Sequence, residues 1–493
     1  MYSRFLFIGL GGSGGKTLRF IKRELLSVME EHGIENPRIP KAWQFLNFDT
    51  PTNPDGGELD SFVKPLDVNE YQGLITRGTT LVDLQRGLDQ RTQLHSELQG
   101  WRVHPQGVSI GLSKGAGQFR AVGRSVAMSS ATKITREIRE RLKTLKDSDQ
   151  AELDEIEEAI TGKSPKGGKQ PATHIMIISS LAGGSGAGML LEVCDIIRGM
   201  DRGMGDEIFG VLYTPEVFEA LGAGSTGGVQ PNALAAISEV LNGYWHGGDN
   251  EPDSSSSVPH IEDRVLESVG LANTIVNSGP AYPFLIGRVN QQGIDHNNPV
   301  RLFEIVAKSI SSMMTSPTVY DKFVAYVIGN WHQYKTDRQA ASTNDILVNA
   351  GLTEEQGYPV FSSLGYARLS IGIQYFKRYA VERILKATYD HLTQYHYRSK
   401  EALDIQKDLD ENNPDIVAQE IAKQHEFRFK DLAGLNEITD EFNQVQDAIT
   451  PEGINSDVSA RQAAEKFQSN VIRAVQDRIG NSKKIEGTEA RKI

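Results

Sequence analysis

Two glycine-rich segments constrain the fold of this chain more than any other feature. Residues 9–15 (GLGGSGG) and 183–188 (GGSGAG) each follow a short apolar run and precede a stretch with helical periodicity. The apolar runs, 3–10 and 174–180, have the length of buried strands. Glycines placed there let backbone N–H groups approach an anion, and the N-terminus of the following helix adds a favourable dipole. The sequence therefore predicts a nucleotide-binding α/β domain whose two glycine loops wrap the phosphates.

The rest of the pattern extends this prediction to a whole sheet. Further strands are predicted at 41–48, 208–213 and 282–289, and helices at 16–31, 122–145, 189–200, 232–245 and 300–314. Strands that alternate with helices at this spacing form a Rossmann-like parallel sheet covered on both faces. The pattern then changes, because 361–373 can hold one or two strands whereas the chain from 375 onward is largely helical and charged.

Composition limits the classes of protein that fit. The chain has 493 residues, one cysteine and a formal net charge of −12. One cysteine excludes an intrachain disulfide framework and any multi-cysteine metal site. An acidic balance makes nucleic acid an unlikely partner, since binding to it relies on basic surface. No run approaches the ~18 apolar residues of a membrane span, and the apolar start lacks a signal-peptide cleavage site. We expect a cytoplasmic protein.

The first glycine segment alone fits several families. Gly9, Gly11 and Gly14 match the dinucleotide-binding pattern G-x-G-x-x-G, which is a weak signal by itself. The segment also ends in G-K-T as a P-loop does, but Leu10 stands where the first P-loop glycine belongs. A P-loop or dinucleotide-binding enzyme, and a glycine turn without a ligand, are therefore alternatives. Neither enzyme class needs the second glycine segment.

The second segment, with its neighbours, resembles the FtsZ/tubulin superfamily. Residues 182–188 (AGGSGAG) are similar to the superfamily loop G-G-G-T-G-[ST]-G that follows the fourth strand. Four other landmarks appear in the superfamily order, at 9–15 (first phosphate loop), 47–50 (end of the second strand), 115–124 (GAGQFRAVGR, the γ-phosphate loop) and 213–219 (YTPEVFE, the ribose loop). Over residues 1–220 the chain is thus identified as a divergent prokaryotic tubulin-like protein.

This resemblance implies GTP or GDP with Mg²⁺ as the ligand. It implies ribose contacts from Glu219 and Asn290 and stacking of Phe303 on guanine. For Asn290 an ordinary loop residue, and for Phe303 a core position, are the alternatives. Ala307 stands where a polar residue is expected, so the choice between guanine and adenine stays open. The remaining implied nucleotide-binding residues are Gly11, Gly12, Ser13, Gly14, Asp49, Gly115, Ala116, Gly117, Arg124, Gly183, Gly184, Ser185, Gly186, Ala187 and Gly188.

The resemblance also implies GTP hydrolysis between subunits. In the superfamily, a loop after the central helix presents an acidic residue to the nucleotide of the next subunit. The best candidate here is Asp321, although Val319 replaces the expected Asn. The chain would then be a GTPase that assembles head to tail. The alternative is a nucleotide-dependent scaffold with little hydrolysis, which engages a protein partner through the helical C-terminal region.

The same comparison predicts the domain organisation. We expect a nucleotide-binding domain over residues 1–299 and a central linking helix over 300–316. Residues 317–493 would form a divergent second domain with a helical extension, because only one of the strands of the superfamily's second domain is recognisable.

Overall fold

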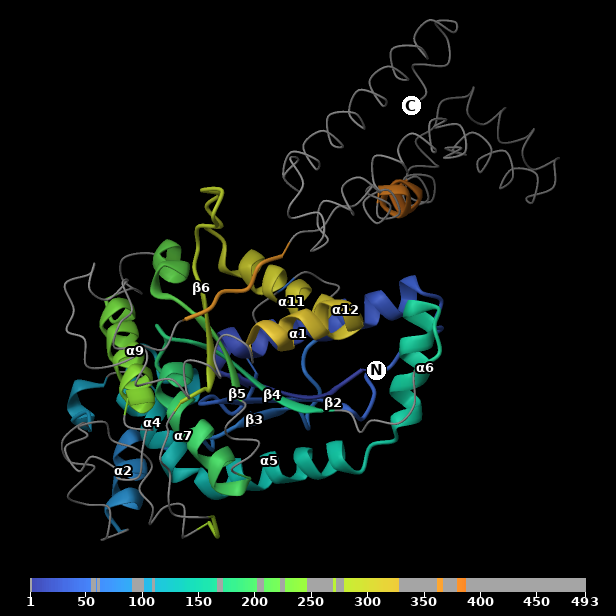
Figure 1. Cartoon of the computed structure of the whole chain (residues 1–493). Coiled ribbons are helices and arrows are strands. Elements are labelled where there is room, and N and C mark those ends of the chain that lie inside the picture. The colour runs from blue at the N-terminus through green and yellow to red at the C-terminus, as the bar shows by residue number, and fades with distance from the viewer. Residues whose placement is uncertain are drawn as a thin grey trace, which may run out of the picture. The chain divides into compact units, whose positions relative to one another are not determined.

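The computed structural model describes residues 2–54, 59, 63–90, 102–108, 111–165, 172–201, 208–221, 227–245, 269–271, 279–327, 361–366 and 379–386. These residues form a six-stranded parallel sheet in the order β3-β2-β1-β4-β5-β6 (Figure 1). The strands are β1 (Arg4–Leu10), β2 (Trp43–Asp49), β3 (Tyr71–Gly73), β4 (Thr173–Ser180), β5 (Ile208–Tyr213) and β6 (Tyr282–Ile286). The α/β class and the parallel sheet predicted from the sequence are confirmed.

Helices cover both faces of this sheet (Figure 1). On one face lie α1 (Gly11–Glu31), α6 (Gln150–Thr161), α11 (Pro299–Thr315) and α12 (Pro317–Val327). On the other lie α2 (Leu81–Asp89), α4 (Arg120–Ser129), α5 (Ala131–Lys146), α7 (Ser185–Met200) and α9 (Val229–Trp245). Each face of the sheet has its own hydrophobic core, because side chains alternate along a strand. Phe5 and Phe7 of β1 pack in the core that includes α1 and α11, whereas Leu6 and Ile8 pack in the core that includes α4 and α7. Burial on both faces explains the unbroken apolar runs of the sequence.

Several element boundaries differ from the sequence-based expectation. Helices α1 and α7 begin at Gly11 and Ser185, so most of the glycines that were expected to form loops lie in first helical turns. The helix expected at 122–145 is interrupted at Ser130, and the strand expected at 282–289 ends at Ile286. Because glycine has low helix propensity, the sequence predicted later starts for α1 and α7 than the structure shows. Tertiary contacts override this propensity.

The chain divides into two compact units, Met1–Tyr366 and Ala367–Ile493. Of the strand expected at 361–373, residues 361–366 are described, and Ser362 forms a parallel bridge to Phe284 of β6. In the second unit residues 379–386 are helical, and the remaining part of the expected helical C-terminal region lies outside the described residues. Within the described part of the chain, no helix is both long and apolar enough to span a membrane.

A buried histidine anchors α12 to the sheet. His174, near the amino end of β4, is 6% exposed, and its Nε2 forms a hydrogen bond with the Tyr320 hydroxyl of α12. The rings of Phe5 and Phe209 pack on either side of the imidazole. This apolar surrounding lowers the pKa of His174 to about 4, because burial penalises the charged form.

We expect the stability of the protein to fall as the pH drops from about 6.5 to about 4. In this window the unfolded chain binds a proton at His174 that the folded chain excludes, since the folded pKa lies near 4 and an unfolded histidine near 6.5. The loss amounts to at most about 1.4 kcal/mol per pH unit. Urea unfolding at several pH values would measure it, and a His174→Phe variant should have a shallower slope. An unchanged slope in that variant would assign the effect to other groups.

Candidate nucleotide-binding site

The two glycine-rich segments lie at the point where the strand order reverses. From β1 the chain proceeds to β2 and β3 on one side, whereas β4, β5 and β6 follow on the other side. Ligands of open α/β sheets bind outside the carboxyl ends of the strands at such a point. Because β1 and β4 are adjacent, parallel and in register from Arg4–Thr173 to Gly9–Ile178, the segments that follow them are neighbours.

Backbone contacts that only glycine permits bring three glycine segments together. A Cβ on Gly11, which has a φ of +68°, would lie 3.0 Å from the backbone nitrogen of Gly186. A Cβ on Gly186 would lie 2.7 Å from the carbonyl oxygen of Leu10. The third segment joins them because the N–H of Gly184 donates to the carbonyl of Gly117 at 2.9 Å. The structure therefore assembles the sequence-predicted segments 9–15, 115–117 and 183–188 into one cluster.

Two helices begin in this cluster, and neither N-terminus has a side-chain cap. Leu10 precedes α1 and Gly184 precedes α7, and neither provides a side chain that accepts from the first turn. The first N–H groups of a helix lack intrahelical acceptors and favour an anion. Gly183 adjoins this point, is half-buried and has no atom within 4 Å of the position that its Cβ would take. Open space at Gly183 therefore adjoins the two uncapped helix N-termini.

Polar side chains from β2 border the cluster. The hydroxyl oxygens of Thr50 and Ser185 are 2.9 Å apart, which joins the end of β2 to the start of α7. Asp49 is buried and its Oδ1 accepts from the N–H of Thr50 at 2.7 Å. Thr50 lies in the 47–50 stretch that the sequence singled out, but its pairing with Ser185 was not predictable from spacing.

Arg124 takes part in a buried ion pair. Its Nε lies 2.5 Å from Oε1 of Glu192 on α7, and both side chains are nearly inaccessible to solvent. Burial raises the pKa of the Glu192 carboxyl, whereas the charge of Arg124 lowers it. Helices α4 and α7 approach closely at this level, since a Cβ on Gly188 would lie 2.3 Å from the carbonyl of Arg120. The structure therefore places Arg124 between two helices.

The residues expected near the ribose lie at the carboxyl ends of β5 and β6. Glu219 is exposed, in a 3₁₀ helix over Pro215–Leu221, and its Oε2 is 3.3 Å from Nη1 of Arg288. Asn290 lies beyond the end of β6, where its Oδ1 accepts from the N–H groups of Gln292 and Ile294. Its side chain thus closes its own turn.

The residue expected to stack on guanine lies in the core. Phe303 is 3% exposed and packs edge-on against Tyr213, with ring centroids 4.9 Å apart. The Tyr213 hydroxyl is hydrogen-bonded to Oγ1 of Thr17 on α1 at 2.8 Å. Ala307, one turn later, is fully buried as well.

Asp321 lies near the amino ends of the strands, whereas the glycine cluster lies at their carboxyl ends. The segment expected to be a loop is α12, on which Asp321 is exposed. Its neighbour Tyr320 contacts Phe5 and His174 near the amino ends of β1 and β4. The amino ends of β1 and β4 are separated from the glycine cluster by the length of these strands, which have seven and eight residues. This length is roughly 25 Å at the usual rise per residue.

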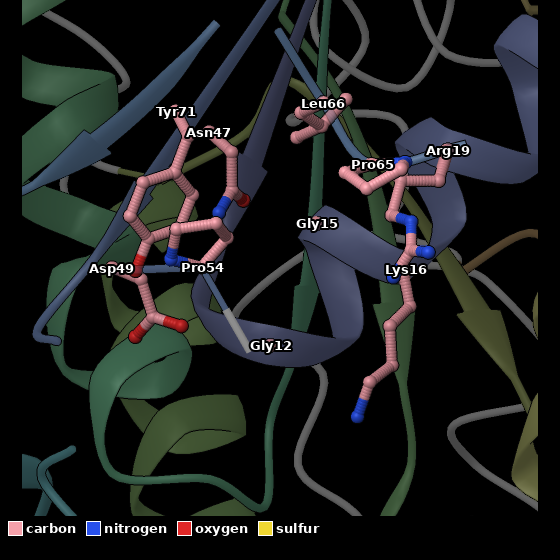
Figure 2. Close-up of a pocket in the computed structure, with 10 residues that line it drawn as sticks. All are labelled: Gly12, Gly15, Lys16, Arg19, Asn47, Asp49, Pro54, Pro65, Leu66 and Tyr71. Carbon is pink, nitrogen blue, oxygen red and sulfur yellow. The ribbon is translucent and has the colours of Figure 1, made fainter. Parts of the chain in front are cut away.

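A small cavity, the β2-side slot, opens beside the start of α1 (Figure 2). Its volume is about 130 Å³, whereas sites for whole drug-sized ligands measure about 300–1,000 Å³. Its walls are Gly12, Gly15, Lys16 and Arg19 of α1, Asn47 and Asp49 of β2, Tyr71 of β3, and Pro54, Pro65 and Leu66 of the connection between β2 and β3. Of these residues, only Gly12, Gly15, Asn47 and Asp49 belong to the ligand-binding segments predicted from the sequence.

Comparison with known proteins decides the family. Residues 6–390 match the sequence model of the family described as tubulin-like, which is well over half of the chain. This chain belongs to the tubulin-like family. The resemblance predicted from the five sequence landmarks is therefore confirmed. Among solved structures, CetZ from Methanosaeta thermophila strain DSM 6194 is similar at 11% sequence identity with a TM-score of 0.30. The match covers 66% of this chain and 60% of that chain. No curated protein matches.

Proposed function

We propose that this tubulin-like protein binds GTP and GDP, with the phosphates over the carboxyl ends of β1 and β4. One observation carries the proposal. Three glycine segments meet at the strand-order reversal, where the uncapped N-termini of α1 and α7 adjoin the open space over Gly183. Backbone N–H groups supply this anion site without positive side chains, which is compatible with a net charge of −12.

The hydroxyl of Ser185 at the cluster fits the Mg²⁺ that accompanies a nucleoside triphosphate. Ser185 would hold the ion together with phosphate oxygens and water, since Mg²⁺ prefers hard oxygen ligands and keeps several waters, while the fully buried Thr50 would orient the Ser185 hydroxyl across their 2.9 Å contact. A bound Mg²⁺ would neutralise part of the negative charge of the phosphates. Among the described residues no group of three or more His, Cys, Asp or Glu side chains forms a dedicated metal site.

We further propose hydrolysis between subunits that stack head to tail in the cytoplasm. The exposed carboxylate of Asp321 lies near the amino ends of the strands, and the proposed phosphate site lies at their carboxyl ends. A subunit stacked on the next would therefore bring Asp321 towards a neighbouring nucleotide, where a carboxylate orients the attacking water. Contacts of this heterologous kind do not close and build filaments.

Phosphate release and sedimentation, measured against protein concentration with GTP, test this proposal. Turnover should rise more than linearly with concentration, and Asp321→Ala should lower it by about 10²-fold, the usual contribution of a general base. Glu30→Ala is the matched control, because Glu30 is an exposed carboxylate close to the C-terminus of α1, at the same edge of the sheet. Equal turnover in the wild type and Asp321→Ala would remove the catalytic role, and failure of the wild type to bind GTP would contradict the whole proposal.

One observation favours a second candidate, a nucleotide-dependent scaffold with little hydrolysis. Asp321 lies on a helix and lacks the Asn two positions before it, so the expected catalytic loop is altered. For a scaffold, GTP binding would be retained while phosphate release stays flat with concentration. A protein partner would then bind to the C-terminal region.

A further inference from the structure

One amide side chain attaches helix α9 to two of the three glycine segments. Nδ2 of Asn232, in the first turn of α9, donates to the carbonyl oxygen of Gln118 at 2.7 Å and to that of Ala182 at 3.0 Å. Two carbonyl acceptors fix the orientation of the amide, because only its NH₂ group can donate to them. Asn232 therefore joins the chain next to residues 115–117 to the chain next to residues 183–188.

Other contacts hold α9 in the same place. Arg120 of α4 forms an ion pair with Glu239 of α9, in which Nη1 is 3.2 Å from Oε1. The side-chain oxygen of Gln118 accepts from the N–H of Gly228, directly before α9. The apolar side chains of α9 that are buried against the sheet are Ala233, Ala236 and Val240. Removal of the Asn232 amide should thus leave α9 attached while two carbonyl groups lose their donor.

The bond to Ala182 determines the direction of the next N–H group. A peptide unit is planar and trans, so its C=O and its N–H point in opposite directions. Because the carbonyl of Ala182 points at Asn232, the N–H of Gly183 points away from it. Among the residues that the structure describes, none accepts from this N–H. The N–H of Gly183 is therefore held in a fixed direction and is available to a ligand.

This direction matters for an anion at the glycine cluster. Gly183 has open space at its Cβ position and directly precedes Gly184, the residue before α7. Each peptide unit is a dipole whose N–H end attracts a negative charge and whose carbonyl end repels it. Rotation of the Ala182–Gly183 peptide would present a carbonyl oxygen in place of the donor. The Asn232 amide opposes this rotation, because it would lose one of its two acceptors.

We propose that Asn232 is a positioning residue of the phosphate site. Its amide holds the carbonyls of Gln118 and Ala182 towards α9, so that the N–H of Gly183 faces the phosphates. This inference rests on the proposed function, because it assumes that the phosphates adjoin Gly183. Asn232 touches no phosphate in this arrangement and acts through the backbone of the two segments.

Titration of two Asn232 variants with GTP and with inorganic tripolyphosphate tests the role of the amide. Asn232→Ala removes the donor without adding a charge. Asn232→Asp keeps the shape of the side chain, but its carboxylate can only accept and repels both carbonyls. We expect both variants to bind both ligands more weakly, by roughly ten- to a hundredfold, the usual effect of losing one hydrogen bond to a charged group.

Glu239→Ala is the matched control, because it removes another contact between α9 and α4 and leaves the Asn232 amide in place. It should bind GTP as the wild type does, whatever stability it loses in a thermal melt. An equal loss of GTP affinity in Glu239→Ala and Asn232→Ala would make Asn232 a mere attachment of α9 and contradict the inference. Wild-type affinity in Asn232→Ala would contradict it as well. If the wild type bound neither ligand, the proposed function itself would fail.

An NMR signal reports the N–H of Gly183 directly. Labelling with carbonyl-labelled alanine and nitrogen-labelled glycine selects the amides of glycines that follow an alanine, as Gly183 does, and a Gly183→Ala variant identifies the signal by its absence. Tripolyphosphate should shift this amide proton downfield in the wild type, as a hydrogen bond to an anion does. Saturated Asn232→Ala should lack most of this shift. A full shift in the saturated variant would show that the peptide keeps its direction without Asn232, and would overturn the inference.

Discussion

A Gly183→Asp variant is expected to lose GTP binding and to keep the stability of the wild type. No atom lies within 4 Å of the Cβ position at Gly183, and its φ is outside the left-handed region, so the folded state accommodates a side chain. The added carboxylate would occupy the space proposed for a phosphate. Two unit charges 4 Å apart repel by about 4 kcal/mol at an effective dielectric constant of 20, which corresponds to a loss of affinity of at least about a hundredfold.

Isothermal titration with GTP, beside a thermal melt, would measure both properties of this variant. Gly184→Ala is the matched control, because its Cβ would lie 2.6 Å from the carbonyl oxygen of Gly117, where backbone cannot yield easily. We expect Gly184→Ala to lower the melting temperature, in contrast to Gly183→Asp. A Gly183→Asp protein that binds GTP within threefold of the wild type would show that the phosphates lie elsewhere.

Arg124→Met is expected to cost about 3–5 kcal/mol of unfolding free energy, the usual effect of leaving one partner of a buried ion pair uncompensated. Glu192, its partner at 2.5 Å, is 2% exposed and would be left as a buried carboxylate that must stay charged or bind a proton. The double variant Arg124→Met/Glu192→Leu should recover most of the loss, because apolar replacement of a whole buried pair is often neutral.

Urea denaturation of the two single variants and the double variant would measure these differences. The double variant also tests the γ-phosphate role that the sequence motif implies for Arg124. If Arg124 only holds α4 against α7, the refolded double variant should bind GTP as the wild type does. A stable double variant with greatly weakened GTP binding would instead assign the guanidinium to the nucleotide.

Five of the six strands could be predicted closely from the sequence, whereas the short edge strand β3 was missed and the helix starts could not be predicted. Each central strand is buried on both faces, so its residues are apolar without interruption, and β5 was predicted with its observed ends, 208 and 213. Helices α1 and α7 begin several residues before the predicted positions, because glycines that disfavour helix locally are held in helical turns by contacts with distant backbone.

Partners distant in sequence account for the other differences. Arg124 stands in a recognisable motif, yet no local pattern identifies Glu192 as its partner. Phe303 lies on an apolar helix face, and the sequence left stacking on a base and burial in the core as alternatives. Contact with Tyr213 of β5 places it in the core. The β2-side slot is built from three separate stretches of chain and has no sequence signature.

By itself the sequence determined the α/β class, the family and the two glycine segments that adjoin the proposed phosphate site. These properties follow from local patterns, since alternation of apolar runs, glycines and helical periodicity is legible within a few residues. Only the tertiary structure decided what each glycine is for. Gly186 lacks a Cβ because Leu10 occupies that space, whereas the corresponding space at Gly183 is open. From the sequence, a glycine shows only that no side chain is present. The residues that surround it in the folded protein determine whether backbone fills the space at the Cβ position or leaves it open to a ligand.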